Sequence, residues 1–230
     1  GSLKALWIFA EDVVQTDPNT HHVVKAMQGL DLLVVQEIFM SETAKMADVV
    51  LPGTTFLEKS GTFTNTERRI QQVNAAVKPL PGTKTDGQII VEMMRKLGLD
   101  QPDFDAAEVL KEVASVVSFF EGVTWEGLAA SPMGLQWPVN KKGEDTQILH
   151  IGEFKRGKGK FHYHDWKESE ELTKHKNEYP FILTTSRELQ HYNCATMTRR
   201  TSNVQILTKD VIMLNPRDAK AKDLISGDRA

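Results

Sequence analysis

A polar cluster late in the chain contains side chains that could act on a small molecule. The run ILTTSRELQHYNCATMTRR, residues 182–200, places the single cysteine, Cys194, three residues after His191. A thiolate–imidazole pair acts as a nucleophile only when a third group orients the imidazole. Nothing in the sequence supplies that group at a specific spacing, and cysteine is among the residues most often buried. We therefore predict a buried, structural Cys194.

The same cluster also suits the binding of an anion. Arginine offers a planar fork of donors to phosphate, and tyrosine and asparagine add neutral hydrogen bonds. The residues concerned are Arg187, His191, Tyr192, Asn193, Arg199 and Arg200. A solvated turn would have a similar composition, so the residue types alone leave both interpretations open.

Two further groups have a functional and a structural interpretation. His162 and His164 in FHYHDW resemble metal ligands, but no second ligand pair follows at zinc-site spacing, which favours a polar strand face. Asn65, Arg68 and Arg69 in GTFTNTERR could bind phosphate. For the two arginines we favour buried ion pairs that hold a long loop.

The composition excludes several classes of protein. A net charge of -3 over 230 residues argues against binding nucleic acid through bulk charge. No apolar run approaches the roughly 20 residues of a membrane span, so we expect no membrane insertion. One cysteine excludes an internal disulfide framework and favours a reducing compartment, and we predict a cytoplasmic location. The ends, GSLKALWIFA and LISGDRA, suggest a fragment of a longer protein, whether Gly1-Ser2 is native or a tag remnant.

The elements that position these residues begin with an alternation of strands and helices. Apolar runs at 3–10, 32–38 and 49–51 have strand length, and the first two read as strands buried on both faces. A helical pattern that ends at Gly29 and a short helix over 42–47 separate them. This order predicts an α/β fold with a parallel sheet.

Ligands of parallel sheets bind at the carboxyl ends of the strands. Asp12, Thr16 and Asp17 follow the first strand, and Glu37 ends the second. An acidic residue in that position commonly binds sugar hydroxyls, although no G-x-G-x-x-G phosphate loop is present. These residues predict a nucleotide site.

The middle of the chain changes from irregular to helical. Residues 54–85 read as mostly irregular, and a loop of this length is usually functional or packs on a neighbour. Asp86 is predicted to cap a helix that Gly98 ends, and Asp105 begins a second helix through about residue 117.

The last third reads as a linker followed by the start of another domain. Strands are predicted at 181–185 and 211–214, and a helix over 216–224 has Pro216 in its first turn. Two strands and a helix are too few for a complete domain.

Three blocks resemble the molybdopterin oxidoreductase family. They are ADVVLPGTTFLEKSGTFTNTERRIQQVNAAVKPLPGTKTDGQII at 47–90, LWIFAEDVVQTDP at 6–18 and TTSRELQHYNCATMTRR at 184–200. The HY…TMT pattern is most similar to formate dehydrogenase large (alpha) subunits. Ala10 and Val13 stand where the family's GEDP motif has Gly and Pro, which restricts close approach of the backbone at Ala10.

The resemblance implies a cofactor and the residues that bind it. The cofactor is bis-molybdopterin guanine dinucleotide with molybdenum or tungsten, near a 4Fe-4S cluster whose ligands lie outside this chain. The implied cofactor-binding residues are Glu11, Asp12, Thr16, Gln36, Glu37 and Asp86 for one guanine nucleotide, and Ser186, Arg187, His191, Tyr192 and Asn193 for the other. Arg187 and His191 are the strongest candidates of the second set.

The resemblance also implies how the chain is divided. Residues 1–125 correspond to the central α/β domain, and within them 54–85 pack near the cluster domain. Residues 126–178 form an extended linker, and 179–230 begin the β-barrel that binds the dinucleotide. Catalytic residues and metal ligands of the family lie upstream, so we expect none in this chain and no activity of the chain alone.

The resemblance leaves three functions. The first is a formate dehydrogenase, a metal-binding oxidoreductase that passes two electrons from formate to an iron–sulfur cluster and on to electron-transfer subunits, ferredoxin or an NAD-linked partner. The second is a structural or electron-transfer large subunit of an NADH dehydrogenase-like complex, against which the polar TSRELQHYN run argues. The third is another member of the family, such as a nitrate reductase.

Overall fold

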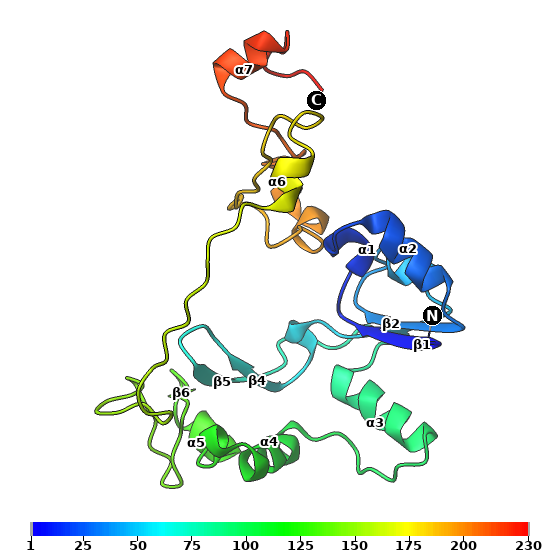
Figure 1. Cartoon of the computed structure of the whole chain (residues 1–230). Helices are drawn as coiled ribbons and strands as arrows, with labels where there is room; N and C mark the ends of the chain where they lie inside the picture. Colours follow the sequence, from blue (N-terminus) through cyan, green and yellow to red (C-terminus); the bar gives the residue numbers. More distant parts are fainter. Residues whose placement is uncertain (1, 230) are drawn as a thin grey trace. The chain divides into compact units, whose positions relative to one another are not determined.

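The computed structural model describes residues 2–229 of the chain (Figure 1). The chain divides into two compact units, Gly1–Lys167 and Glu168–Ala230.

The first unit begins with a three-stranded parallel sheet. Its strands β1 (Ala5–Phe9), β2 (Leu32–Glu37) and β3 (Val49–Pro52) lie in the order β1-β2-β3. Helix α2 (Thr20–Gln28) lies on one side of this sheet and α3 (Asp86–Lys96) on the other (Figure 1). The predicted parallel α/β arrangement is confirmed.

The central strand of this sheet is the best buried. Val35 of β2 is inaccessible to solvent and packs with Ile8, Leu33 and Met27. The prediction that the first strand is buried on both faces is wrong, because Phe9 is 48% exposed. Among the described residues β1 has a neighbouring strand on one side, whereas β2 has one on each side and is better covered.

Short helical turns occupy the loops that follow the strands. Helix α1 (Val13–Thr16) lies in the predicted polar loop after β1. The 3₁₀ helix η1 (Ala44–Met46) replaces the longer helix predicted over 42–47. The Ser41 hydroxyl accepts a hydrogen bond from the Ala44 N–H at 3.1 Å, which satisfies one of the free donors of that turn.

Ala10, which stands at the glycine position of the family motif, has a left-handed backbone with φ 51°. This conformation costs a residue with a Cβ roughly 1–2 kcal/mol. Glycine avoids that cost, but the greater conformational entropy of its unfolded chain lowers the stability of the protein by about 0.4–1 kcal/mol relative to alanine. We expect Ala10→Gly to raise the free energy of unfolding by up to about 1 kcal/mol in urea titrations. Ala5→Gly, in the regular strand β1, should lower it, and a loss in both variants would contradict the strain at Ala10.

An antiparallel sheet forms where an irregular segment was predicted. Strands β4 (Gly61–Thr64) and β5 (Arg69–Val73) form a hairpin, and β6 (Leu135–Gln136) pairs with β5. The turn is fixed by Asn65, whose side-chain oxygen accepts from two backbone N–H groups within the turn at 2.9 Å. The prediction that residues 54–85 are mostly irregular is therefore wrong over the hairpin. Its threonines and glutamines give no apolar alternation from which the strands could be predicted.

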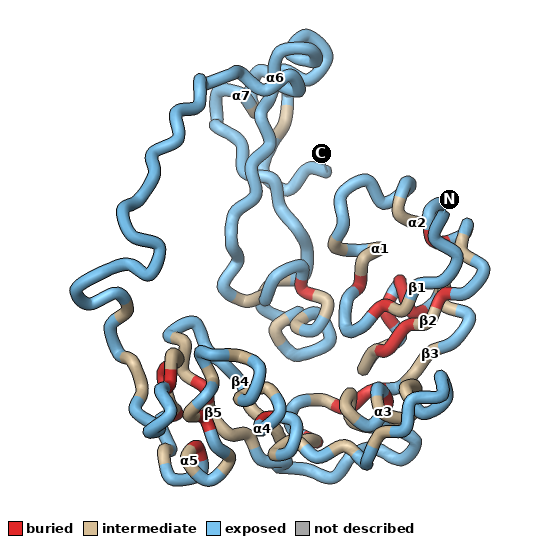
Figure 2. Tube along the Cα trace, turned by 60° about the horizontal axis from the view of Figure 1, so that its bottom comes forward, coloured by how far each residue is buried: buried red, intermediate tan, exposed pale blue. Residues whose placement is uncertain are grey.

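A second apolar core forms around the hairpin. Helices α4 (Ala106–Val116) and α5 (Trp125–Ala129) contribute Leu110 and Leu128, which pack with the inaccessible Ile70 of β5. The buried positions along β2 and β5 stand out in Figure 2. Two 3₁₀ helices, η2 (Phe56–Glu58) and η3 (Ser118–Phe120), complete this unit.

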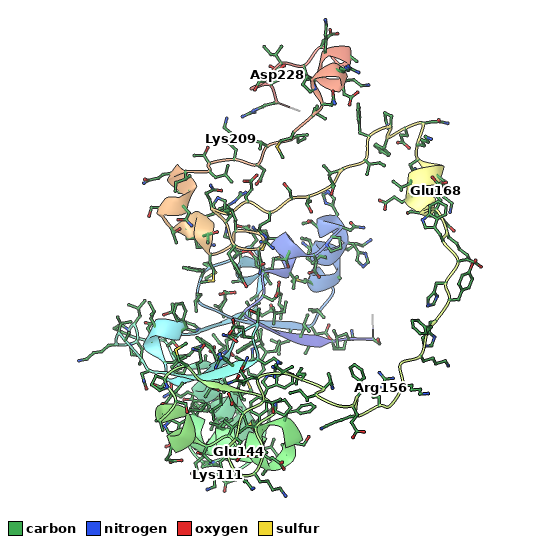
Figure 3. The ribbon with its side chains drawn as sticks, turned by 90° about the vertical axis from the view of Figure 1, so that its left-hand side faces the viewer. Lys111, Glu144, Arg156, Glu168, Lys209 and Asp228 are labelled. Carbon is green, nitrogen blue, oxygen red and sulfur yellow. The ribbon has the colours of Figure 1, made fainter. Side chains whose placement is uncertain are left out.

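The end of the first unit is extended and exposed. Phe161, Tyr163 and Trp166 are more than four-fifths exposed. Figure 3 shows the side chains projecting from an extended backbone between the labelled Arg156 and Glu168. Within residues 2–229 no helix is both long and apolar enough to cross a membrane.

The second unit consists of short helices and loops. Its helical elements are α6 (Glu170–Lys174), η4 (Thr198–Arg200), η5 (Ser202–Gln205) and α7 (Pro216–Ala221). The predicted C-terminal helix is confirmed as α7, capped by the Asn215 side chain with Pro216 at its first position. Ala195 is the one buried residue in the described part of this unit.

The two strands predicted in this unit are absent from its described residues. Segments 181–185 and 211–214 have no strand assignment, and Leu183 and Met213 are about four-fifths exposed. A strand needs the N–H and C=O groups of a neighbour, and these segments have no ladder partner within the described chain. No closed barrel is present among the residues described.

Candidate cofactor-binding site

Three side chains from separate segments meet at the carboxyl end of the parallel sheet. Gln36, the next-to-last residue of β2, is 1% exposed, and its Nε2 donates to Asp86 Oδ1 at 2.9 Å. The other oxygen of Asp86, Oδ2, accepts from the Lys59 ammonium. The Lys59 and Asp86 side chains are 28% and 26% exposed, so solvent reaches one side of the group. We call these three residues the Gln36 cluster.

Backbone contacts bring Asp86 to the sheet. The Lys84 N–H donates to the Pro52 carbonyl at 3.2 Å, and Gly53 forms a parallel bridge with Lys84. This pairing extends the end of β3 toward the start of α3. Ligands of parallel sheets bind at this edge, so the fold itself places Asp86 there.

Thr85, not Asp86, caps α3. Its hydroxyl accepts from the Gln88 N–H at 3.4 Å, and the Gln88 side chain accepts in return from the Thr85 N–H at 2.9 Å. This reciprocal pair is a capping box. Asp86 therefore lies one residue inside the helix, where its carboxylate is free to bind Gln36 and Lys59 instead of the helix end.

Buried polar atoms near this edge lack partners. Gln36 Oε1 and Thr54 Oγ1 are buried and have no hydrogen bond among residues 2–229. Thr54 follows Gly53 directly and is 2% exposed. A buried polar atom without a partner costs about 1–3 kcal/mol. Both atoms can accept a hydrogen bond, so they suit a ligand that carries N–H or O–H donors.

Glu37 and Gly53 line the same edge. The Glu37 carboxylate accepts from the Ile38 N–H at 2.7 Å, and its carbonyl accepts from the Gly53 N–H at 3.1 Å. A Cβ at Gly53 would lie 3.5 Å from Asp86 Oδ1. Glu37 thus follows Gln36 at this edge, but its carboxylate binds the backbone N–H of the next residue, Ile38.

Asp12 is a structural residue in this fold. It is 5% exposed, and its Oδ1 accepts from the Thr43 N–H at 3.0 Å and the Thr43 hydroxyl at 2.7 Å. These bonds join the loop after β1 to the loop after β2. The neighbouring Glu11 carboxylate accepts from the Thr16 hydroxyl at 2.9 Å and is exposed.

The candidates in the second unit divide into bonded and exposed residues. Both ring nitrogens of His191 have partners, Thr198 Oγ1 at 3.0 Å and the Leu207 carbonyl at 3.1 Å. A carbonyl only accepts, so Nε2 carries the proton and Nδ1 accepts from the hydroxyl. Ser186, Arg187, Tyr192 and Asn193 are exposed, and the Arg187 side chain has no bonded partner within the described part of the chain.

Cys194 is exposed, which makes the prediction of a buried cysteine wrong. Its sulfur lies 3.2 Å from Thr196 Oγ1. The turn around Asn193 and Ala195, both with positive φ, presents Cys194 outward while Ala195 is buried. His191 is bonded elsewhere, so no thiolate–imidazole pair forms.

Arg68 holds a loop through carbonyl groups. Its guanidinium donates to the carbonyls of Trp137, Thr146 and Gln147, the last two at 3.1 and 3.0 Å. Arg69 pairs with Glu67 at 3.3 Å. The predicted buried ion pairs are wrong, because Arg68 binds carbonyls and Arg69 pairs with a Glu67 side chain that is 69% exposed, although Arg68 does hold the loop.

No metal cluster is found around the histidine pair. Within residues 2–229 no group of three or more His, Cys, Asp or Glu side chains could hold a metal ion.

Sequence reasoning missed Lys59 and the neighbouring Glu58. Glu58 Oε2 accepts from the N–H and hydroxyl of Thr55 at 2.8 and 2.9 Å, and its Oε1 accepts from the Leu80 N–H at 2.9 Å. The Thr-x-x-Glu spacing of TFLE is a capping-box signal that could have revealed this role. Glu58 therefore fixes the segment that carries Lys59.

The hydrogen bonds from Thr55 and Leu80 hold the pKa of Glu58 below its usual 4.5. A carboxyl whose pKa is lowered by folding stabilises the folded protein fully above about pH 4.5. This stabilisation is lost as the pH falls through the pKa of the folded state. We expect Glu58→Gln to lower the melting temperature by several degrees at neutral pH, with a difference from wild type that shrinks below pH 4.5. Glu112→Gln on the exposed face of α4 is the control, and a constant Glu58→Gln difference down to pH 3 would contradict this linkage.

Two models of known protein families match the sequence of this chain. Residues 1–96 match the sequence model described as molybdopterin oxidoreductase, and 181–230 match the molydopterin dinucleotide binding domain. The chain belongs to the molybdopterin oxidoreductase family. The second match falls on the segment where the two predicted strands do not form, so the sequence matches this domain although no sheet is present among its described residues, 181–229.

Two relatives of this molybdopterin oxidoreductase chain are archaeal. It is 41% identical over 233 residues to the "F420-dependent formate dehydrogenase subunit alpha" of Methanocaldococcus jannaschii. The aligned region covers 99% of this chain and 34% of the relative. It is also 41% identical to a formate dehydrogenase 2 subunit alpha of Methanococcus maripaludis, with the same coverage. The chain thus spans about a third of the length of these relatives.

Among solved structures, acetylene hydratase from Pelobacter acetylenicus aligns with a TM-score of 0.69 at 23% identity. The alignment covers 98% of this chain and 33% of the hydratase, and supports the fold alone. The residues at the sheet edge are compatible with a nucleotide that carries N–H donors, because Gln36 Oε1 and Thr54 Oγ1 are buried acceptors without a partner in the described part of the chain.

Proposed function

We propose that this chain holds a molybdopterin guanine dinucleotide in a formate dehydrogenase of which it is one part. The observation that carries the proposal is Gln36 Oε1, a buried acceptor without a partner among residues 2–229 at the edge of the sheet where ligands bind. Guanine presents an imide N–H and an amino group, so it can donate to such an acceptor. The two formate dehydrogenase alpha subunits at 41% identity support the choice of reaction.

Each residue of the first site has a different task. Gln36 accepts a hydrogen bond from the base, and Asp86 and Lys59 hold the Gln36 amide in place. Asp12 maintains the loop that borders the site by its bonds to Thr43. When bound, the cofactor with molybdenum or tungsten supplies the redox chemistry.

The second unit contributes a separate binding segment. Arg187 is exposed and offers a guanidinium that suits a pyrophosphate, and Ser186, Tyr192 and Asn193 add neutral hydrogen-bonding groups. His191 keeps the shape of this loop through Thr198 and Leu207 and does not itself have a free ring nitrogen. We propose that Arg187 is the main contact of this segment.

The overall reaction proposed for the full-length protein is the oxidation of formate to carbon dioxide, with release of one proton and two electrons. The electrons pass to a 4Fe-4S cluster and then to a partner subunit, for which ferredoxin and NAD-linked proteins are candidates. The chain described here contributes no catalytic residue, and we expect it to be inactive by itself.

Metal analysis and formate-dependent dye reduction on the full-length protein test this function. Molybdenum or tungsten at about one ion per protein, together with dye reduction by formate, is the expected result. Well-folded protein without either metal would instead support a structural subunit of an NADH dehydrogenase-like complex. Bound metal with reduction of nitrate, and no reaction with formate, would identify another member of the family.

A further inference from the structure

The orientation of the Gln36 amide is fixed by its partner. A carboxylate only accepts hydrogen bonds, so the group facing Asp86 Oδ1 at 2.9 Å must be the Gln36 NH₂. The carbonyl oxygen then points away from Asp86, where it is buried and has no partner among residues 2–229. The hydrogen-bonding character that the site offers a ligand therefore depends on Asp86.

Asp86 is itself held by Lys59. The ammonium donates to Oδ2, which leaves Oδ1 for Gln36. Lys59 comes from the segment that Glu58 anchors through three hydrogen bonds to Thr55 and Leu80. Two successive contacts, Lys59 with Asp86 and Asp86 with Gln36, thus connect the partly exposed Lys59 to the buried side-chain oxygen of Gln36.

We propose that Lys59 is a positioning residue that sets the base selectivity of this site through Asp86 and Gln36. Asp86 only accepts, so the Gln36 amide presents its oxygen to the ligand, and Lys59 on Oδ2 holds the Asp86 carboxylate in the orientation that keeps the oxygen aimed at the imide and amino groups of guanine. Adenine has an unprotonated ring nitrogen where guanine has its imide N–H, so the Gln36 oxygen disfavours it. The inference rests on the proposed cofactor function.

Lys59→Met tests the role of the ammonium. Without a donor on Oδ2, the Asp86 carboxylate can rotate and the Gln36 amide loses its fixed direction. In full-length protein prepared without cofactor, titrated with GMP and AMP, we expect the wild-type preference for GMP to fall by about tenfold. Lys59→Arg keeps a donor and should retain the preference. Lys111→Met removes an exposed ion pair with Glu108 on α4 and should match wild type.

Asp86→Asn provides a second, directional test. Lysine only donates, so the oxygen of the new asparagine side chain would face Lys59 and its NH₂ would face Gln36. The Gln36 amide must then turn, and it presents NH₂ to the ligand in place of oxygen. Loss or reversal of the GMP preference, with a melting temperature near wild type, is the expected result. An unchanged preference in either Asp86→Asn or folded Lys59→Met would overturn the proposal.

Failure of this inference is distinguishable from failure of the proposed function. If purified wild-type protein releases no guanine nucleotide on acid denaturation and binds no GMP, the cofactor assignment is wrong. If wild type contains guanine nucleotide and prefers GMP while Lys59→Met does so equally, the cofactor assignment stands and the role of Lys59 is refuted. Lys59→Met that unfolds leaves the decision to Asp86→Asn.

Discussion

Gln36→Leu should lower the guanine nucleotide content of the full-length protein at least about tenfold and leave its fold intact. Leucine has a similar volume and suits a position that is 1% exposed, but it offers no acceptor to the base. It removes a buried oxygen that has no partner among residues 2–229, and it also removes the Nε2 hydrogen bond to Asp86, so the cofactor-free protein should stay folded with a stability within about 1–2 kcal/mol of wild type. Nucleotide released by acid and quantified per protein, with thermal unfolding of the same samples, measures both effects.

Gln136→Leu is the matched control for this prediction. Gln136 is also buried, at 9% exposure, but its Nε2 donates to the Glu67 carbonyl at 3.0 Å and it lies in the antiparallel sheet. Its replacement should lower stability and leave the nucleotide content unchanged. Full nucleotide content in Gln36→Leu would contradict the assignment of Gln36 to the binding site.

Asp12→Ala should lower the free energy of unfolding by about 2–4 kcal/mol. The substitution removes the acceptor of two buried hydrogen bonds and leaves the N–H of Thr43 buried without its partner. The loops after β1 and β2 then lose their connection at the edge of the sheet. A urea titration monitored by tryptophan fluorescence measures this loss in the free energy of unfolding.

Asp12→Asn separates the hydrogen bonds from the charge. The asparagine oxygen can still accept from Thr43, so about 1 kcal/mol of destabilisation is expected. If Asp12→Ala were as stable as wild type but had lost the nucleotide, Asp12 would be a direct ligand and not a structural residue. Equal destabilisation by the two variants would show that charge, and not hydrogen bonding, holds the loop.

Several elements could be predicted from the sequence because their signals are local. The apolar runs that became β1, β2 and β3, the Asp105 cap and the Pro216 start each depend on residues within one segment. The hairpin β4–β5 was missed because its threonines and glutamines give no apolar alternation. Its strand character comes from pairing and from the apolar layer behind Ile70.

The candidate site shows the same division between composition and geometry. The resemblance placed Gln36 and Asp86 in one site, although they are 50 residues apart in the chain, and the structure joins them by one hydrogen bond. It could not indicate that Asp12 is bonded to Thr43 or that both ring nitrogens of His191 have partners. Those bonds depend on where loops from different strands meet.

The sequence by itself determined the family, the parallel sheet and the edge at which a ligand binds, because local patterns and family motifs carry this information. Only the tertiary structure decided which polar groups are satisfied by the protein and which remain for a ligand. The capping box of Thr55 and Glu58 indicates a turn before Lys59 but not the partner of Lys59, whose role exists because Asp86 lies beside it in the folded chain. Hydrogen-bond satisfaction is a property of three-dimensional neighbours, and a linear pattern does not encode it.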